Sequence, residues 1–457
     1  MSSIPASGLG EDDLGDDLVV ERGKLAATDV APSEKPEIAE LPRLGELPEP
    51  ADAPLPTLPI TERLVSLDAY RGLTMILMVS AGLQISRVVA SFDKSPDLAH
   101  LKTPLWEALA QQTDHAKWVG CSLWDLIQPS FMFMVGAALP FSIASRRAKG
   151  HSFSWMLVHA IVRSVVLVLL GVFLMSSWTA RTNWTFDNVL TQIGMGYAFL
   201  FLLAWVRPRW QLAAAGGILL VYWAAFALYP APVLDPAKFN MPADWHRLEG
   251  FAAHWEKHVN LGARVDQWFL NLFPRVSGKP FDFYPEGYVS LNFIPSLATM
   301  IFGLLAGELV RSSRLTAGRK LGIMVGAGLL GLGVGWLLGW SGLCPIVKRI
   351  WTPSWAIFSA GWAFVTLAAF YLVLDVARWR AWALPLVVVG MNSIAAYCIS
   401  MTMKSWVREN MRRHFGEGVY NHPFGALYAP MVEAGFFLLF AWALCWWMYR
   451  KKVFVRI

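Results

Sequence analysis

His115 and Asp125 are the residues that could do chemistry in the segment DHAKWVGCSLWDLIQP, which leads into a long apolar run. A neutral imidazole can take up and return a proton near physiological pH, and it can also carry an acyl group. An ionisable side chain just inside an apolar helix is costly in a bilayer, so it is a functional candidate by default. We therefore interpret the rest of the chain as a scaffold built around His115.

The distance between these two residues leaves the role of Asp125 open. Asp125 follows His115 by ten residues, which corresponds to about 15 Å along a continuous helix. Direct contact would require the intervening loop to fold back. Asp125 is then either the group that orients His115 or a hydrogen-bond partner in helix packing.

The composition indicates an integral membrane protein. Hydrophobic residues make up 55% of the 457 residues, and apolar runs of about 20 residues, the length that spans a bilayer, recur along the chain. The formal net charge of +6 combines an N-terminal part of 60 residues with 13 acidic and four basic residues and a remainder that carries +15. The positive excess lies in short loops, which favours membrane orientation over nucleic-acid binding.

We predict an all-α fold with about ten transmembrane helices, preceded by a disordered, acidic, Pro-rich cytoplasmic tail over residues 1–61. The membrane domain is predicted to cover residues 62–457. The predicted spans are approximately 71–91, 121–143, 155–176, 188–206, 211–229, 289–310, 319–339, 354–375, 382–403 and 428–449. Basic residues fall in alternate loops, so we expect both termini to be cytoplasmic. The longest connection, 230–288, is predicted to form an extracytoplasmic cap.

Polar residues gather at the predicted outer ends of these helices. They are His115, Asp125, Asn188, Gln192, Glu286, Asn292, Lys348 and Trp351. Buried polar groups need partners, and these residues could partner one another. Asn392 lies instead in the middle of a predicted span. Ordinary interhelical hydrogen bonds remain an equal interpretation for the Asn and Gln residues.

Asp68 and Arg71 form a separate candidate pair in the motif SLDAYRG. They are three residues apart, so they share a helix face and can neutralise each other. The predicted topology places them at the cytoplasmic mouth of the first span. They therefore cannot share a small pocket with His115, although a long ligand could touch both.

Metal binding and disulfides receive little support from the sequence. His254 and His258 lie four residues apart in HWEKH, but no third ligand is evident, so we expect no metal. Cys398 and Cys445 are predicted to be core residues, whereas a bridge between Cys121 and Cys344 stays open.

Several motifs in matching order resemble the heparan-α-glucosaminide N-acetyltransferase family. The first are SLDAYRG and the His115 segment, in which Trp118, Gly120, Asp125, Pro129 and Gly136 match. The others are FYPEGYVSLNFIPSLATMIFGLLAGEL from Phe283, KRIWTPSW from Lys348, GMNSIAAY from Gly390 and YRKKVFVRI from Tyr449. The resemblance covers roughly residues 62–457.

The resemblance implies a multi-pass acyltransferase that moves acetyl from cytosolic acetyl-CoA to an amino sugar across the membrane. His115 matches the catalytic histidine, which acts as base on the amine or as carrier of the acetyl group, and Asp125 is the second candidate catalytic residue. The expected donor-binding residues are Asp68, Arg71, Gln192 and Asn392. The expected acceptor-binding residues are Asn188, Glu286, Lys348 and Trp351.

An acidic tail stands where the animal members have a lumenal domain and an anchor. We therefore expect a bacterial inner-membrane homologue acting on an envelope or imported amino sugar or glycan. Its expected partners are that acceptor and the lipid bilayer, with no nucleic acid, and a homodimer is left open. The alternatives are a transporter or flippase for a polar solute, and an acyltransferase that uses another acyl group.

Overall fold

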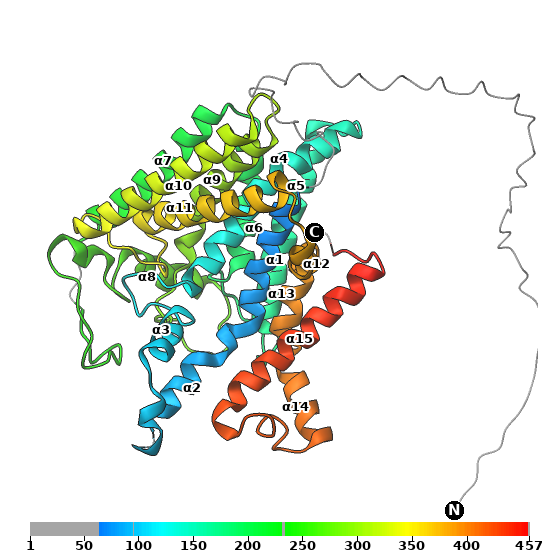
Figure 1. The fold of residues 1–457 in the computed structure, drawn as a ribbon. Coiled ribbons are helices and arrows are strands. Elements are labelled where there is room, and N and C mark those ends of the chain that lie inside the picture. Colours follow the sequence, from blue (N-terminus) through cyan, green and yellow to red (C-terminus); the bar gives the residue numbers. More distant parts are fainter. Residues whose placement is uncertain (1–63, 95, 231–233, 456–457) are drawn as a thin grey trace, which may run out of the picture. The chain divides into compact units, whose positions relative to one another are not determined.

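The computed structural model describes residues 64–94, 96–230 and 234–455 (Figure 1). The acidic tail predicted over residues 1–61 lies outside them. The longer helices are α1 (Val65–Ser80), α4 (Ile127–Ala148), α5 (Phe153–Ser176), α6 (Val189–Leu203), α7 (Pro208–Leu228), α9 (Phe293–Arg311), α10 (Ala317–Trp340), α11 (Pro353–Phe370) and α15 (Ala429–Arg450). The shorter ones are α2 (Ile85–Phe92), α3 (Pro104–Gln112), α8 (Leu261–Phe269), α12 (Leu384–Met391), α13 (Ser393–Thr402) and α14 (Lys404–Phe415).

The prediction of a helical membrane protein is confirmed. Within the described residues, eight helical segments are long and apolar enough to cross a membrane. A further pair, Ala381–Met391 with Ser393–Thr402, passes the same test but is bent by 68°. The apolar helix α6 has 15 residues, about 22 Å, which is short of the roughly 30 Å of a hydrocarbon core. Each of the ten predicted spans is helical, but the count of ten stays a prediction.

Helix α4 lies at the centre of the bundle and packs against α1, α6, α9 and α11. Its contact with α9 depends on glycines. A Cβ atom on Gly136 would lie 1.9 Å from the carbonyl oxygen of Met300, and one on Gly303 would lie 1.9 Å from that of Phe133. The two backbones therefore touch, as is usual where small residues line a helix interface in a membrane. This contact fixes the position of α4.

The first span is interrupted beside the segment that carries His115. Helix α1 ends at Ser80, and the next four residues, 81–84, all have positive φ before α2 begins. A left-handed run with non-glycine residues is strained, and such strain often accompanies functional sites. At Gly82 a Cβ atom would lie 2.8 Å from the carbonyl oxygen of Thr113. The break therefore lets the backbone before His115 approach the end of α1.

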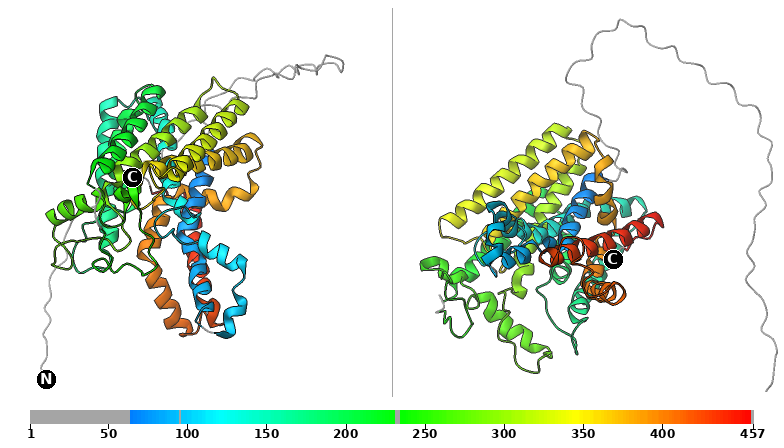
Figure 2. Two further views of the ribbon diagram at one scale, coloured as in Figure 1. Left: turned by 90° about the vertical axis from the view of Figure 1, so that its left-hand side faces the viewer. Right: turned by 60° about the horizontal axis from the view of Figure 1, so that its bottom comes forward.

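The segment between α7 and α9 packs over the loop that carries His115. The indole nitrogen of Trp118 donates to the carbonyl oxygen of Trp255 at 3.1 Å, and both side chains are buried. They belong to one apolar cluster with Phe226, Val289 and Val347. This segment includes α8, and Figure 2 shows it as the green loops beside the bundle. Its packing holds the His115 loop against the end of α7.

The side-chain environments of the two histidines in HWEKH and of the cysteines are as follows in the described residues. His254 and His258 do not converge, because Nδ1 of His254 lies 2.7 Å from the carbonyl oxygen of Tyr229 whereas His258 stacks on Phe239. The four cysteines are free, so the Cys121–Cys344 bridge does not form.

Candidate active site

His115, Asp125 and Lys348 meet in one cluster. Nδ1 of His115 lies 2.7 Å from Oδ1 of Asp125. Nζ of Lys348 lies 3.3 Å from the same oxygen and 3.1 Å from Nδ1 of His115. The side chains of Asp125 and Lys348 are 2% and 7% exposed, whereas that of His115 is 35% exposed. A buried carboxylate and a buried ammonium thus support an accessible imidazole.

The loop before α4 folds back on itself, and hydrogen bonds to the carboxylate of Asp125 hold it in this shape. Asp125 lies in a short 3-10 turn, Trp124–Leu126, that leads into α4. Its Oδ2 accepts the backbone N–H groups of Ala116 and Ser122, each at 3.1 Å. One carboxylate therefore ties together both ends of the loop that carries His115. Of the two roles left open by the sequence, the geometry favours the one in which Asp125 orients His115.

The cluster sets the protonation pattern of the imidazole ring. A carboxylate only accepts hydrogen bonds, and the contact of Nδ1 with Asp125 is shorter than its contact with Lys348, so we assign the Nδ1 proton of His115 to the bond with Asp125; Lys348 then donates to Asp125. In the neutral ring Nε2 is then left with a free lone pair. The nearby ammonium group of Lys348 balances the charge of Asp125, which limits the cost of burying either group. This arrangement suits an imidazole that accepts a proton or attacks a carbonyl carbon through Nε2.

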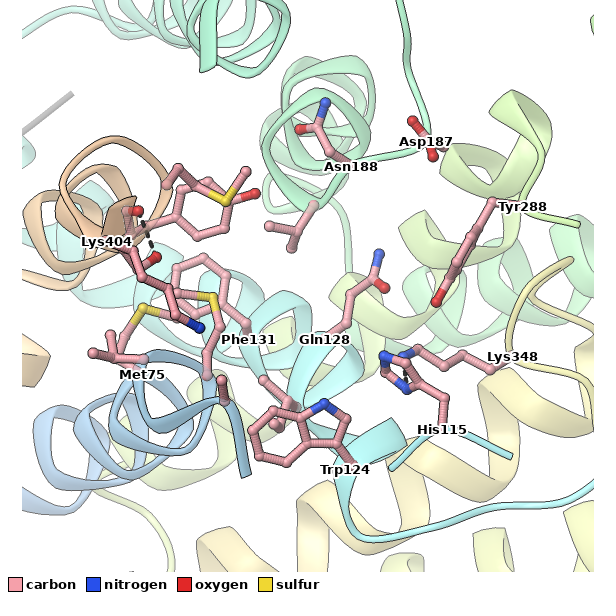
Figure 3. Close-up of a pocket in the computed structure, with 18 of the residues that line it drawn as sticks. Met75, His115, Trp124, Gln128, Phe131, Asp187, Asn188, Tyr288, Lys348 and Lys404 are labelled. Carbon is pink, nitrogen blue, oxygen red and sulfur yellow. Dashed lines mark hydrogen bonds between the residues drawn. The ribbon is translucent and has the colours of Figure 1, made fainter. Parts of the chain in front are cut away.

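His115 lines a cavity of about 480 Å³ (Figure 3). The cavity is lined by residues of α1, α4, α6, α13, α14 and α15 and of the segments that precede α4, α6, α9 and α11. The polar side chains that line it include His115, Gln128, Asp187, Asn188, Tyr288, Lys348, Tyr397, Ser400 and Lys404. Apolar residues, among them Met75 and Phe131, supply the remaining wall. A pocket of this volume and lining suits a small polar ligand with an apolar arm.

The four predicted acceptor-binding residues occupy different places. Lys348 and Asn188 line the cavity, and Asn188 also caps α6 through its side-chain oxygen. Glu286 is exposed and meets Arg349 through its backbone oxygen at 2.6 Å. Trp351 is fully buried, and its indole nitrogen donates to Thr299 at 3.2 Å. Among the described residues, Glu286 and Trp351 therefore do not line the cavity.

Gln192 and Asn392, both predicted to bind the donor, do not line the His115 cavity, and their side chains are hydrogen-bonded to neighbouring residues. Gln192 accepts a hydrogen bond from Gln128 at 3.2 Å and donates to the backbone oxygen of Asp187 at 2.9 Å. Both of those partners line the His115 cavity. Asn392 lies at the break between α12 and α13, where it donates to the backbone oxygen of Val453 and accepts the backbone N–H of Val455, each at 3.2 Å.

A second cavity, of about 280 Å³, follows the first along α4. Phe131 lines both cavities, and Arg146 lines the second near the other end of α4. Arg71 and Arg163 line it as well, and Arg71 is paired with Asp68 at 3.5 Å, as predicted. Phe131 and Arg146 are separated by about 22 Å of helix. The second cavity thus brings three guanidinium groups together far from His115.

Sequence reasoning missed several residues of the two cavities. Arg163 lies within the apolar run of α5, and an ionisable residue inside a span is itself a signal. Asp187 immediately precedes Asn188, and burial raises the pKa of its carboxyl group above the usual value. Gln128, Tyr288 and Lys404 also line the His115 cavity. Their spacing gave no sign of this, because they come from three distant segments.

The chain matches one family model and is similar to curated proteins of known activity. A family model described as a domain of unknown function (DUF5009) matches residues 63–241. The chain is 24% identical over 441 residues to human heparan-alpha-glucosaminide N-acetyltransferase, with 86% of this chain and 60% of the relative covered. The mouse protein of the same name is 22% identical over 437 residues, with the same coverage.

These matches show a distant family relationship to the heparan-α-glucosaminide N-acetyltransferases, which confirms the resemblance seen in the sequence motifs. The chain spans about 60% of the length of these curated relatives. The relationship supports an acyltransferase-like membrane enzyme.

Proposed function

We propose that this protein transfers an acetyl group from cytosolic acetyl-CoA, through His115, to the amine of an amino sugar or glycan on the opposite side of the membrane. The observation that carries the proposal is the contact of His115 with buried Asp125 at the wall of the larger cavity. The distant relationship to N-acetyltransferases adds the type of group that is transferred.

The two cavities along α4 suit a long donor with a charged head. Arg71, Arg146 and Arg163 can bind phosphate groups of the nucleotide, because guanidinium groups bind phosphates in a bidentate manner. The slender arm of the donor then reaches past Phe131, which lines both cavities. Its thioester carbon would meet His115 at the far end.

His115 can perform the transfer in two ways. As a base, Nε2 takes the proton of the amine while the new C–N bond forms, the C–S bond breaks and the CoA thiolate leaves. As a nucleophile, Nε2 first forms the C–N bond to the acetyl group and releases CoA, and the amine then displaces the imidazole. In both routes Asp125 stabilises the positive charge that develops on the ring. Lys348, which lines the same cavity, can donate to the oxyanion.

The orientation that we propose follows from the basic loops. With ten spans, the groups Arg146–Arg147, Arg207–Arg209, Arg311–Arg319, Arg378–Arg380 and Arg450–Lys452 lie on one side, and that side is cytoplasmic by the positive-inside rule. Both termini are then cytoplasmic, and His115 with the segment between α7 and α9 faces outward. The membrane is the bacterial inner membrane, and the chain acts on an envelope or imported sugar.

A vesicle experiment tests this function. Purified protein is reconstituted, labelled acetyl-CoA is supplied on the side of the basic loops, and glucosamine is enclosed on the other side. We expect label in N-acetylglucosamine within the vesicle. Label that stays in CoA on the donor side contradicts the proposal.

A transporter for polar solutes is the second candidate, because two spans are interrupted. The chain leaves the α1 helix at residues 81–84 and bends by 68° between α12 and α13, and broken helices are common in transporters. The same vesicles separate the two functions. Equilibration of glucosamine without acetylation would favour transport.

A further inference from the structure

A polar groove with four cations and two carboxylates in its lining adjoins the His115 cavity. Its volume is about 430 Å³, and Lys404 lines both the groove and the cavity. Figure 3 shows Lys404 and His115 on opposite sides of the cavity. The groove therefore continues the cavity on the side away from the imidazole.

The cations of the groove come from two helices that α15 brings together. Lys404, Arg408 and Arg412 follow one another at intervals of four residues along α14, so they share one face of that helix. Arg87 joins them from α2. Helix α15 contacts both α2 and α14, and Figure 1 shows the three lying together at one end of the molecule. Tertiary packing thus assembles a basic surface that no single segment displays.

Carboxylates offset this charge only in part. Glu417 and Glu433 line the groove with the four cations, and Arg412 is paired with Glu433 at 3.8 Å. Burial lowers the pKa of Lys404, and Arg87 and Arg408 lower it further against the opposing effect of Glu433. The cations therefore repel one another across the empty groove, and a bound anion would relieve that repulsion.

The position of these four cations is unexpected under the positive-inside rule. In the proposed orientation, the groove shares the extracytoplasmic side with His115. Arginine and lysine are depleted there in short loops. A convergent set of four is thus unlike a general solubilising surface.

The geometry points to a binding site for a phosphate group in this groove. Arginine forks and a lysine ammonium are the side chains that proteins use to hold phosphate. The phosphate belongs either to a sugar acceptor whose amine reaches His115 past Lys404 or to the headgroup of a phospholipid. The acceptor source rests on the proposed function, whereas the lipid source does not.

Binding to the full-length protein in nanodiscs of neutral lipid tests the acceptor source. The probes are glucosamine 6-phosphate and glucosamine, and the variants are Arg408→Gln and its control Arg413→Gln. Arg413 lies on the same helix but is exposed and outside the groove. We expect the phosphorylated sugar to bind at least about tenfold more tightly than glucosamine, and Arg408→Gln to remove about tenfold. Arg413→Gln should leave both affinities unchanged.

The lipid source is tested with nanodiscs that contain phosphatidylglycerol. If the phosphate is a headgroup, native mass spectrometry detects phosphatidylglycerol retained by the wild type and by Arg413→Gln but lost from Arg408→Gln. The proposal is overturned if neither phosphate-bearing probe is preferred over its neutral counterpart, or if Arg413→Gln loses as much affinity as Arg408→Gln.

These binding measurements need no turnover, so they are independent of the vesicle assay. Acetyl transfer to glucosamine without any preference for phosphate would retain the proposed function and reject the groove. If Arg408→Gln removes phosphate binding but the wild type shows no acetyl transfer, the groove is retained as a phosphate site and the proposed function is rejected.

Discussion

The two cavities along α4 differ in the kind of charge that they present. The larger cavity holds groups that can change their protonation state, His115 and Asp187, beside the ammonium group of Lys348. The smaller cavity holds three arginines and no carboxylate among the described residues that line it. Arginine keeps its charge at every physiological pH. One cavity is therefore suited to move protons and the other to hold an anion.

The contacts that hold the side chains of the two cavities in place also differ. His115 is held by a carboxylate that is itself fixed by two backbone N–H groups, so its ring orientation is determined by the loop. Arg163 is held by a contact to the hydroxyl oxygen of Tyr197 at 3.1 Å, and Arg146 lies 2.6 Å from His159. Rigid support matters where a reacting atom must be placed, whereas anchoring of a phosphate tolerates some movement. The comparison predicts different kinetic signatures for the two cavities.

The largest expected effect is that of His115→Ala. Because the base or nucleophile is removed, we expect the rate of acetyl transfer to fall by about 10²–10⁴-fold or more. Donor binding, measured by equilibrium binding of labelled CoA, should stay within about twofold. His100→Ala is the matched control, since His100 is exposed and lies outside both cavities. Wild-type turnover in His115→Ala would remove His115 from the mechanism.

Asp125→Asn should have the next largest effect. An amide can donate to Nδ1 of His115 and so stabilise the wrong tautomer, which takes the lone pair away from Nε2. We expect kcat to fall by about 100-fold with little change in KM for the donor. Asp114→Asn serves as the control, because Asp114 is exposed and its carboxylate accepts the backbone N–H of His115 at 2.8 Å, not a proton of the ring. Equal losses in both variants would argue against orientation by Asp125.

Arg163→Gln probes the smaller cavity and should change a different parameter. Loss of one charge-assisted contact to phosphate should raise KM for acetyl-CoA by about tenfold. Because the reacting atoms lie near His115, kcat should remain within about twofold. Arg147→Gln is the control, since Arg147 lies over the ring of Trp205 and outside the cavity. A fall in kcat without a rise in KM would contradict the assignment of donor binding to the smaller cavity and of chemistry to the larger one.

Part of this picture could be predicted from the sequence because it depends on local patterns. Apolar runs of about 20 residues located the helices, and an ionisable residue before such a run identified His115. The spacing of Asp68 and Arg71 predicted their pairing. The sequence resemblance added the acetyl group, which no spacing could provide.

The remaining features depend on how distant segments meet. The contact between Asp125 and His115 requires a loop that folds back, and ten intervening residues do not reveal this. Lys348 reaches the pair from the segment before α11, and Asp187 comes from the segment before α6. Trp351 and Glu286 matched the expected region of the chain but lie outside the cavity, because a difference of a few residues in a loop decides which side chain points inward.

The smallest expected effect is on the pH dependence of the melting temperature, and it concerns the carboxyl group of Asp187 in the larger cavity. Burial raises the pKa of Asp187 above the ordinary value of 3.8, so the folded state holds this proton more tightly than the unfolded state. The resulting stability is complete below the unfolded pKa and is lost as the pH rises through the folded one. The contribution of Asp187 should therefore make the melting temperature of the wild type lower at pH 8 than at pH 4.

Asp187→Asn cannot titrate, so its melting temperature should fall less between pH 4 and pH 8 than that of the wild type. The difference between the two proteins should be smallest at low pH, because a protonated carboxyl group resembles an amide, and should grow by a few degrees toward pH 8. Ser142→Ala is the control from the smaller cavity, and it should leave the pH dependence of the wild type unchanged because it removes neither a charge nor a titratable group. If Ser142→Ala changed the pH dependence as much as Asp187→Asn, the effect could not be assigned to the carboxyl group of Asp187.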